Sequence, residues 1–154
     1  MMSAAISLQQ ADTLIDGALG KGAGLSCSPL TVAVLDPGGH LVALKRQDRS
    51  GILRVEIAVG KAWGALGMGL PTRELARRAE HMPQFFTALA VASCGRVIPV
   101  PGGVLIRSGR DVIGAVGISG DTPDRDEECA VAGVLAAGLV PDTETTEPGS
   151  APAG

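Results

Sequence analysis

The stretch that decides the fold is VIPVPGGVLIRSGRDVIGAVGISGDTPDRDEECA, residues 97–130. Runs rich in β-branched residues alternate with turn signals along it, which predicts an antiparallel meander. Three strands are expected there, at residues 97–100, 104–107 and 112–119, with a glycine-containing turn at 108–111 before the last one. This segment therefore supplies most of the predicted sheet.

A helix is predicted directly after the meander. Thr122 is a capping residue, and Pro123 follows it at the first helical position. The acidic residues behind them suit the positive end of a helix dipole. They are Asp124, Asp126, Glu127 and Glu128. We expect this helix to run to about Leu139.

The N-terminal third predicts a helix followed by a hairpin. Ser7 and Gln10 form a capping-box pattern, and apolar residues then recur at helical spacing up to the glycines of residues 20–24. Strands are expected at residues 30–35 and 40–46, on either side of a Pro-Gly-Gly turn. This hairpin adds two strands to the three of the meander.

Two helices are predicted between the hairpin and the meander. One covers residues 55–66 and has a face of small apolar residues, and the other is strongly charged, is capped by Thr72 and ends near His81. Residues 84–95 carry no decisive pattern. The chain therefore predicts one α+β domain over residues 1–140, with an antiparallel sheet of about five strands flanked by helices. Residues 141–154 lack periodicity and are expected to form a disordered tail.

Composition excludes several classes of partner. The 154 residues include 13 Lys and Arg against 16 Asp and Glu, without a basic block, and one Trp without any Tyr, so nucleic acid is not an expected partner. No apolar run approaches the roughly 18 residues of a membrane span, and the first residues do not resemble a signal peptide, so a cytoplasmic protein without a membrane partner is expected. The hydrophobic content of 45% favours a homo-oligomer that hides apolar surface.

The cysteines and carboxylates do not predict a metal site. Cys27, Cys94 and Cys129 are too few and too scattered for a disulfide framework or a zinc site, so buried thiols are expected. The acidic cluster at residues 124–128 is explained by its place at a helix N-terminus.

Four stretches together resemble the GlcG/HbpS family, which includes the C-terminal domain of PduO-type proteins. They are an Ala-x-x-Leu-Ile pattern in the first helix, VAVLDPGGHLVALKR at 32–46, EIAVGKAWGA at 56–65 and the meander with its helix start at 97–130. The resemblance covers residues 6–139. It implies a profilin-like fold with three-layer α/β/α character in the oligomer, assembly into dimers, tetramers or octamers, and binding of haem or another tetrapyrrole.

The first functional hypothesis is a small-ligand-binding protein whose ligand is haem, as the resemblance implies. His40 and His81 are the candidate axial ligands, since a neutral imidazole nitrogen binds iron. Arg46, with Arg49 and Arg54, is expected near the propionates, and Trp63 is a candidate ligand-binding residue. Residues 8–24 contain no histidine, which departs from a branch of the family that binds haem near the first helix.

The second hypothesis is a cofactor-independent isomerase, lyase or cyclase that acts on a small carboxylate. Lys61, with Glu56 or His40, would then supply the acid and the base, because a desolvated lysine has a pKa closer to neutrality. The backbone amides of Gly102 and Gly103, together with Arg107, would hold the anion. Each of these residues also has an ordinary structural explanation, as a surface ion pair, a strand bend or a lysine at a helix edge. The sequence leaves open whether the protein is an enzyme.

Overall fold

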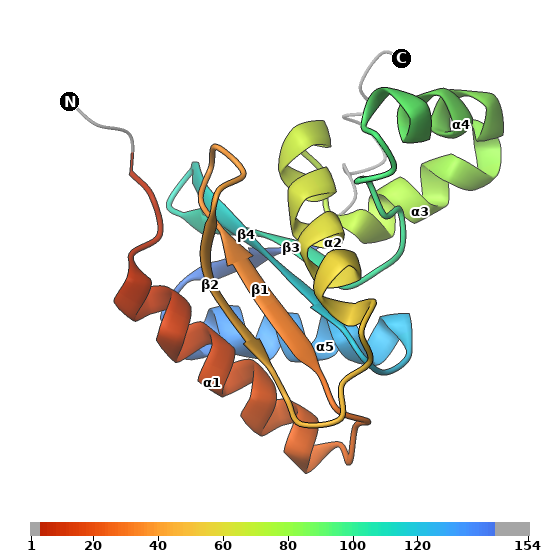
Figure 1. The fold of residues 1–154 in the computed structure, drawn as a ribbon. Helices are drawn as coiled ribbons and strands as arrows, with labels where there is room; N and C mark the ends of the chain where they lie inside the picture. The colour runs from red at the N-terminus through yellow and green to blue at the C-terminus, as the bar shows by residue number, and fades with distance from the viewer. Residues whose placement is uncertain (1–3, 144–154) are drawn as a thin grey trace.

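The computed structural model describes residues 4–143, in which an open antiparallel sheet lies between helices (Figure 1). The sheet has five strands in the order β2-β1-β4-β3-β5, and every neighbouring pair is antiparallel. The strands are β1 (Thr31–Leu35), β2 (Leu41–Arg46), β3 (Gly103–Ser108), β4 (Asp111–Ser119) and β5 (Val140–Asp142). The predicted α+β fold with a five-stranded antiparallel sheet is confirmed.

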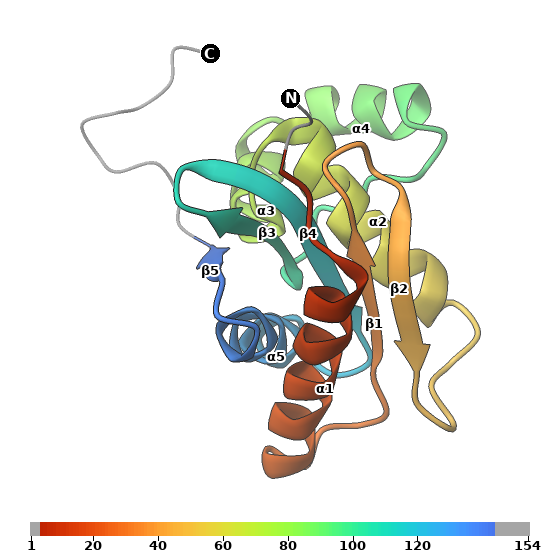
Figure 2. The same cartoon turned by 90° about the vertical axis from the view of Figure 1, so that its left-hand side faces the viewer.

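Helices cover both faces of this sheet (Figure 2). On one face, α1 (Leu8–Gly24) and α5 (Pro123–Ala136) pack side by side, and α2 (Arg54–Met68) crosses the other face. Next to α2 lies α3 (Thr72–His81), and α4 (Pro83–Ala92) extends from α3 away from the sheet. All of β1 is buried because it is covered from both sides. The three layers expected of the oligomer are therefore present in one chain.

The layer of α1 and α5 begins at two capped helix N-termini, both as predicted. The backbone N–H of Gln10 donates to Ser7 Oγ at 3.0 Å, and the N–H of Ser7 donates to Gln10 Oε1 at 2.9 Å. In α5, the N–H of Arg125 donates to Thr122 Oγ1 at 3.3 Å. Such caps satisfy amides that the first turn leaves without partners.

The other layer depends on the close approach of α2 to β4. Gly117 of β4 lies directly beneath the carbonyl oxygen of Ala58, and a Cβ atom at Gly117 would collide with that oxygen. The sheet-facing side of α2 is correspondingly built of small buried residues, including Ala58, Ala62 and Ala65. The short distance between α2 and β4 therefore depends on Gly117 and on these small residues.

The strand predicted at residues 97–100 is wrong. This segment is irregular and lies against α2, where Gly60 and Gly64 leave room for Ile98 and Val97. A Cβ atom at Gly60 would lie 2.7 Å from Ile98 Cγ1. Proline lacks a backbone donor, so Pro99 and the following Pro101 could not have completed a ladder of strand hydrogen bonds.

The fifth strand lies at the C-terminal end of the described chain instead. The last helix ends at Ala136 rather than near Leu139, because Gly138 adopts a left-handed conformation (φ 73°) that stops it. The chain then pairs with β3 through Val140–Asp142, so two residues of the predicted tail belong to the sheet. The rest of that tail, residues 144–154, lies outside the described residues.

Two further elements differ from the predictions. The undecided segment 84–95 contains most of α4. Thr72 is not the cap of α3 but its first residue, after Pro71 at the cap position. Its hydroxyl instead accepts from the backbone N–H of Gly103 at 2.8 Å and donates to the Gly103 carbonyl oxygen at 3.3 Å. Thr72 therefore fastens α3 to the beginning of β3.

Candidate functional site

A cavity of about 400 Å³ lies between α2 and residues 94–98, and we call it the Trp63 cavity. Its walls are mainly apolar and include Ile57, Val59, Trp63 and Ile98. Its polar groups are supplied by Glu56, Cys94 and Arg96. Apolar walls with a few convergent polar groups are typical of small-molecule sites.

Arg96 and the hairpin turn hold Trp63 in place from two sides. The guanidinium carbon of Arg96 lies 3.8 Å from the centroid of the indole ring, which is a cation–π contact. On the turn between β1 and β2, a Cβ atom at Gly39 would lie 3.1 Å from Trp63 Cδ1, and Gly39 has a left-handed φ of 83°. The indole is therefore fixed while part of its surface stays open to the cavity.

The chain reaches this arrangement through two successive left-handed residues after α4. Cys94 has a φ of 56° and Gly95 a φ of 76°, and together they turn the chain back along α2. Non-glycine residues with positive φ are uncommon. The turn places Arg96 over Trp63 and leaves the Cys94 thiol exposed at the cavity.

Trp63 also borders two smaller cavities. One of about 200 Å³ lies between α2 and α4 and is lined by residues that include Met68, Leu89 and Val97. The other, of about 210 Å³, lies beside the hairpin turn at Pro37. Three hollows therefore meet at one aromatic side chain on the outer side of α2.

Lys61, on the sheet-facing side of the same helix, is 2% exposed and has two partners. Its ammonium donates to the carbonyl oxygen of Ile118 at 2.8 Å and to Asp126 Oδ2 at 3.2 Å. Asp126 Oδ1 accepts from the backbone N–H of Asp121 at 2.9 Å. Burial lowers the pKa of Lys61 and raises the pKa of Asp126, while the attraction between the two charges opposes both shifts.

The structure places Gly102 and Gly103 beside Lys61. A Cβ atom at Gly102 would lie 2.7 Å from the ammonium nitrogen, so only glycine fits there. The backbone N–H of Gly103, which was expected to bind an anion, donates to Thr72 instead. Lys61, Gly103 and their partners therefore form a hydrogen-bonded junction of α2, α3, β3, β4 and α5.

The other residues of the acid–base hypothesis lie elsewhere. Glu56 is exposed in the first turn of α2, where the helix dipole favours a negative charge. Arg107 lies towards the opposite end of β3, where its Nε donates to Asp142 Oδ2 at 2.8 Å. The structure consequently does not bring Glu56 or Arg107 to Lys61.

The candidate haem ligands His40 and His81 both lie on the surface. The side chain of His40 is 81% exposed, and its Nδ1 lies 3.2 Å from Asp36 Oδ1. His81 is the exposed last residue of α3. Among the described residues that line the Trp63 cavity, none is a histidine.

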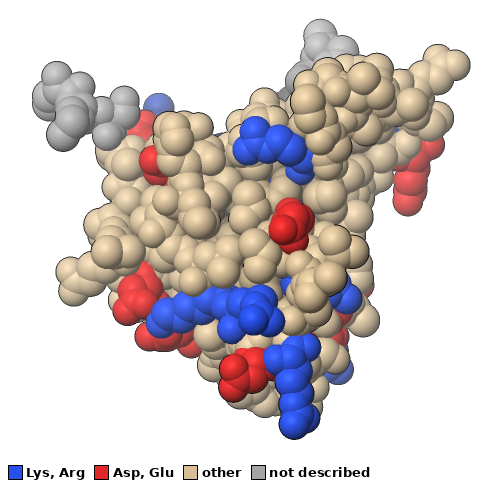
Figure 3. Space-filling view, in the orientation of Figure 1, with Lys and Arg blue, Asp and Glu red and all other residues tan. Residues whose placement is uncertain are grey.

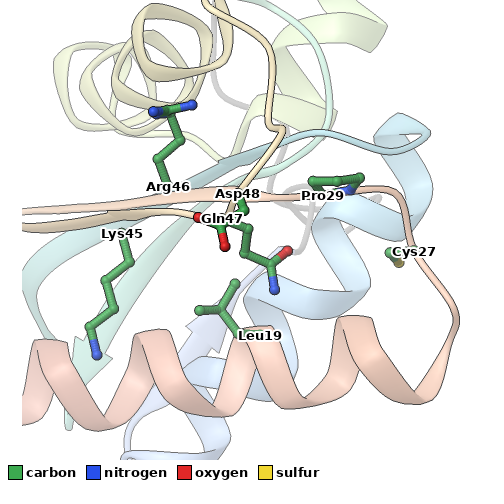
Figure 4. A pocket seen from close by; sticks show the side chains of 7 residues that line it. All are labelled: Leu19, Cys27, Pro29, Lys45, Arg46, Gln47 and Asp48. Carbon is green, nitrogen blue, oxygen red and sulfur yellow. The ribbon is translucent and has the colours of Figure 1, made fainter.

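Arg46 borders a different hollow, an open groove of about 730 Å³ between α1 and the end of β2 (Figure 4). The Arg46 guanidinium donates to the carbonyl oxygen of Ser50 at 3.0 Å and so holds the loop after the hairpin. In that loop Arg49 is exposed, and Arg54 at the start of α2 donates to Ser119 Oγ at 3.0 Å. These three arginines do not line the Trp63 cavity.

The acidic residues at the start of α5 are engaged by cations of the protein. Arg73 Nε donates to Glu127 Oε1 at 2.9 Å, and Lys61 pairs with Asp126. Within residues 4–143, the His, Cys, Asp and Glu side chains form no cluster of three that could hold a metal ion. In the same range of the chain, no helix has the length and apolar character needed to cross a membrane.

Sequence reasoning missed three residues of these sites as functional candidates. Asp126 is one of several acidic residues at a helix start, and the helix dipole already explained all of them. Cys94 lies within the segment 84–95, which has no decisive pattern, and Arg96 directly follows it. The expectation of buried thiols is correct for Cys129 but wrong for Cys94, which is exposed.

The structure is a small α+β domain with a mainly apolar cavity between α2 and residues 94–98. Comparison with known families assigns this domain to a family, because residues 6–135 match the model described as "Haem degrading protein HbpS-like". The chain belongs to this HbpS-like family, which confirms the resemblance noted from the sequence.

Individual relatives agree with this assignment. An uncharacterized 15.0 kDa protein from the dhaT-dhaS intergenic region of Citrobacter freundii is 28% identical over 98 residues, which cover 64% of this chain and 68% of the relative. Protein ORFY of Klebsiella pneumoniae superposes with a TM-score of 0.82 at 25% identity, over 90% of this chain and 94% of ORFY. The PduOC:heme complex superposes with a TM-score of 0.80 at 26% identity, over 88% of this chain and 96% of PduOC.

Proposed function

We propose that the protein binds haem or a related tetrapyrrole in the Trp63 cavity. Membership of the HbpS-like family and the similarity to a protein crystallised with haem support a ligand of this class. The observation that carries the choice of site is the contact between Trp63 and Arg96 at the rim of an apolar cavity.

The residues of the cavity suit the parts of such a ligand. The side chains of Ile57, Val59 and Ile98 offer apolar contacts to a macrocycle, and the Trp63 indole offers an aromatic surface. The Arg96 guanidinium is suited to a propionate carboxylate, because it forms paired, charge-assisted hydrogen bonds. The volume of about 400 Å³ lies within the range of small-molecule pockets, roughly 300–1,000 Å³.

Cys94 is the proposed axial ligand in this cavity. A cysteine thiolate is one of the established protein ligands of haem iron, and the Cys94 thiol is exposed at the cavity. When bound, haem would supply the redox chemistry of its iron. The protein would contribute the thiolate, the aromatic surface and the charge at the rim.

Titration of the purified protein with hemin, followed by absorbance, tests the proposal. We expect a stoichiometric Soret band that shifts in Cys94→Ala and weakens in Trp63→Ala. The variants His40→Ala and His81→Ala are the matched controls, and their spectra should equal that of the unmodified chain. Loss of the band in a histidine variant would move the site away from the cavity. A weak band that no variant changes would argue against haem as the ligand.

We also propose that the protein forms a homo-oligomer through α4. None of the ten residues of α4, all within the described chain, is buried, and the sequence PQFFTALAVA has no charged side chain. Val91 is 77% exposed and Phe85 is 45% exposed. The surface near α4 is accordingly largely free of charged groups (Figure 3). Monomeric proteins seldom leave such patches uncovered.

Light scattering of a size-separated sample tests this interface. We expect an oligomer for the unmodified chain and a folded monomer for Val91→Glu. Gln9→Glu adds the same charge at an exposed position of α1, outside the proposed interface, and is the control. A monomer before any substitution would contradict the proposal. Since α4 also lines the 200 Å³ cavity beside Trp63, a neighbouring subunit on α4 would lie close to the ligand.

A further inference from the structure

We propose that Cys27 and Cys129 are an oxidation-sensitive pair that hydrogen peroxide converts into an intramolecular disulfide. Cys27 lies in the loop after α1, and Cys129 lies in α5. The pair is on the face of the sheet opposite the Trp63 cavity, so this inference does not rest on the proposed function.

The two residues meet beside Gly22, on the buried side of α1. A Cβ atom at Gly22 would lie 3.7 Å from Cys129 Sγ and 3.8 Å from Cys27 Cβ, so both side chains border the same small space. The loop is fixed there, because the backbone N–H of Cys27 donates to the carbonyl oxygen of Gly22 at 2.9 Å. Cys27 also packs against the core cluster that contains Cys129.

The two thiols differ in their access to solvent. Cys129 is completely buried, whereas Cys27 is half-buried and lines the 730 Å³ groove between α1 and β2 (Figure 4). Burial, with a further contribution from the neighbouring Cys27, raises the pKa of the Cys129 thiol to about 12. A thiol reacts as its thiolate, and Cys129 is both shielded from solvent and hard to deprotonate. Cys27 is therefore the thiol that reacts first with an oxidant from solvent.

The reaction proceeds in two balanced steps. The Cys27 thiolate attacks one oxygen of hydrogen peroxide and breaks the O–O bond, which gives a sulfenic acid and, after protonation of the leaving hydroxide, water. The Cys129 sulfur then attacks the Cys27 sulfur, and the hydroxyl group leaves with the Cys129 proton as a second water. Two thiols have lost two hydrogen atoms, and peroxide has been reduced to two waters. A thiol reductant restores the pair.

The test treats the reduced, folded chain with or without hydrogen peroxide, removes the peroxide, and then unfolds the chain in denaturant so that every remaining thiol is alkylated before mass spectrometry. We expect the oxidised monomer to lose two alkylation sites and a digest to contain a peptide that joins Cys27 to Cys129. Cys94→Ser is the matched control and should keep this link, because Cys94 lies outside the pair. Cys129→Ser should instead accumulate a sulfenic acid at Cys27, trapped by dimedone.

Two results would overturn the inference. One is alkylation of both Cys27 and Cys129 after peroxide treatment of the folded protein. The other is a set of disulfides that join only separate chains through Cys94 and disappear in Cys94→Ser. Circular dichroism of each variant verifies that the fold is retained. Hemin titration of the oxidised chain tests the ligand site independently, because the disulfide and the Trp63 cavity lie on opposite faces of the sheet.

Discussion

The two sides of α2 differ in how completely their groups are satisfied. On the side that faces the sheet, the Lys61 ammonium is buried with two oxygen partners, and the small residues around it fit closely against β4. Within residues 4–143, every fully buried side-chain nitrogen or oxygen has a hydrogen-bond partner. On the other side, Trp63 borders three hollows, with the Arg96 guanidinium over its ring and Gly39 of the hairpin turn beside it.

This difference is the reason for proposing the Trp63 cavity, and not Lys61, as the ligand site. The Lys61 ammonium is buried and donates to the carbonyl oxygen of Ile118 and to Asp126 Oδ2, so it joins α2 to β4 and α5. A fixed aromatic ring with open surface around it can receive a ligand without displacing any protein contact.

The largest effect is expected from breaking the buried pair. Asp126→Ala leaves the Lys61 ammonium buried without its countercharge, and we expect a loss of about 3–5 kcal/mol in the free energy of unfolding. Urea denaturation measures it. The double variant Lys61→Met with Asp126→Leu should recover much of the loss, since no uncompensated charge remains. A loss below about 1 kcal/mol in Asp126→Ala would show that solvent reaches the pair.

A smaller loss in the free energy of unfolding is expected from a substitution that pushes α2 away from the sheet. Gly117→Ala places a methyl group against the carbonyl oxygen of Ala58, and the helix must shift, at a cost of about 1–3 kcal/mol. Gly67→Ala is the matched control on the opposite side of α2, where no atom lies within 4 Å of an added Cβ. It should be neutral or stabilising, by up to about 1 kcal/mol. Equal melting temperatures for the two variants would contradict this account of the packing.

The ion pairs of Glu74 in α3, whose partner Arg77 is exposed, differ from the buried Lys61 pair in their expected pH dependence. Hydrogen bonds from Arg77, and then from Arg78, lower the pKa of Glu74 from 4.5 to about 2. Because the pKa is lower in the folded state, this stabilisation is complete above about pH 4.5 and is lost as the pH falls towards 2.

The size of this effect is expected to be about 1–2 kcal/mol, because solvent screens the exposed Arg77. Thermal unfolding of the unmodified chain and of Glu74→Gln between pH 2 and 6 measures it. The difference in stability between the two should shrink as the solution becomes more acidic. A difference that is constant over this range would mean that the Glu74 carboxylate does not titrate there.

The smallest change is expected on the open side of α2. Arg96→Ala removes a positive charge at the cavity and the cation–π contact with Trp63. We expect hemin binding to weaken about threefold to tenfold. The free energy of unfolding should fall by no more than about 1 kcal/mol. Arg110→Ala, at an exposed arginine of the turn between β3 and β4, serves as the control. Unchanged hemin affinity in Arg96→Ala would remove Arg96 from the proposed site.

The fold was largely predictable because its signals are local. The capping box at Ser7, the Pro-Gly-Gly turn and the cap at Thr122 each specify an element from neighbouring residues. The misplaced fifth strand has the same origin: residues 97–100 have strand composition, but their contacts with Gly60 and Gly64 of a distant helix decide their conformation. Tertiary contacts override propensity in such segments.

The candidate site was less predictable because it depends on contacts between distant parts of the chain. The sequence predicts Lys61 near the Gly102-Gly103 pair, and the structure places them together. Its actual partner, Asp126, belongs to another helix and could not be told from the acidic residues beside it. Likewise, nothing local in the sequence indicates that Arg96 covers Trp63.

The three residues of β5 have a consequence for the behaviour of the protein in concentrated solution. Without them, β3 would be an outer strand with a row of free amides and carbonyls, which is a template for strand pairing between molecules. The ion pair between Arg107 and Asp142 clamps this short cover onto β3. Arg107 therefore holds β5 against β3, so that Leu105–Arg107 pair within the chain and are not available to a strand of another molecule.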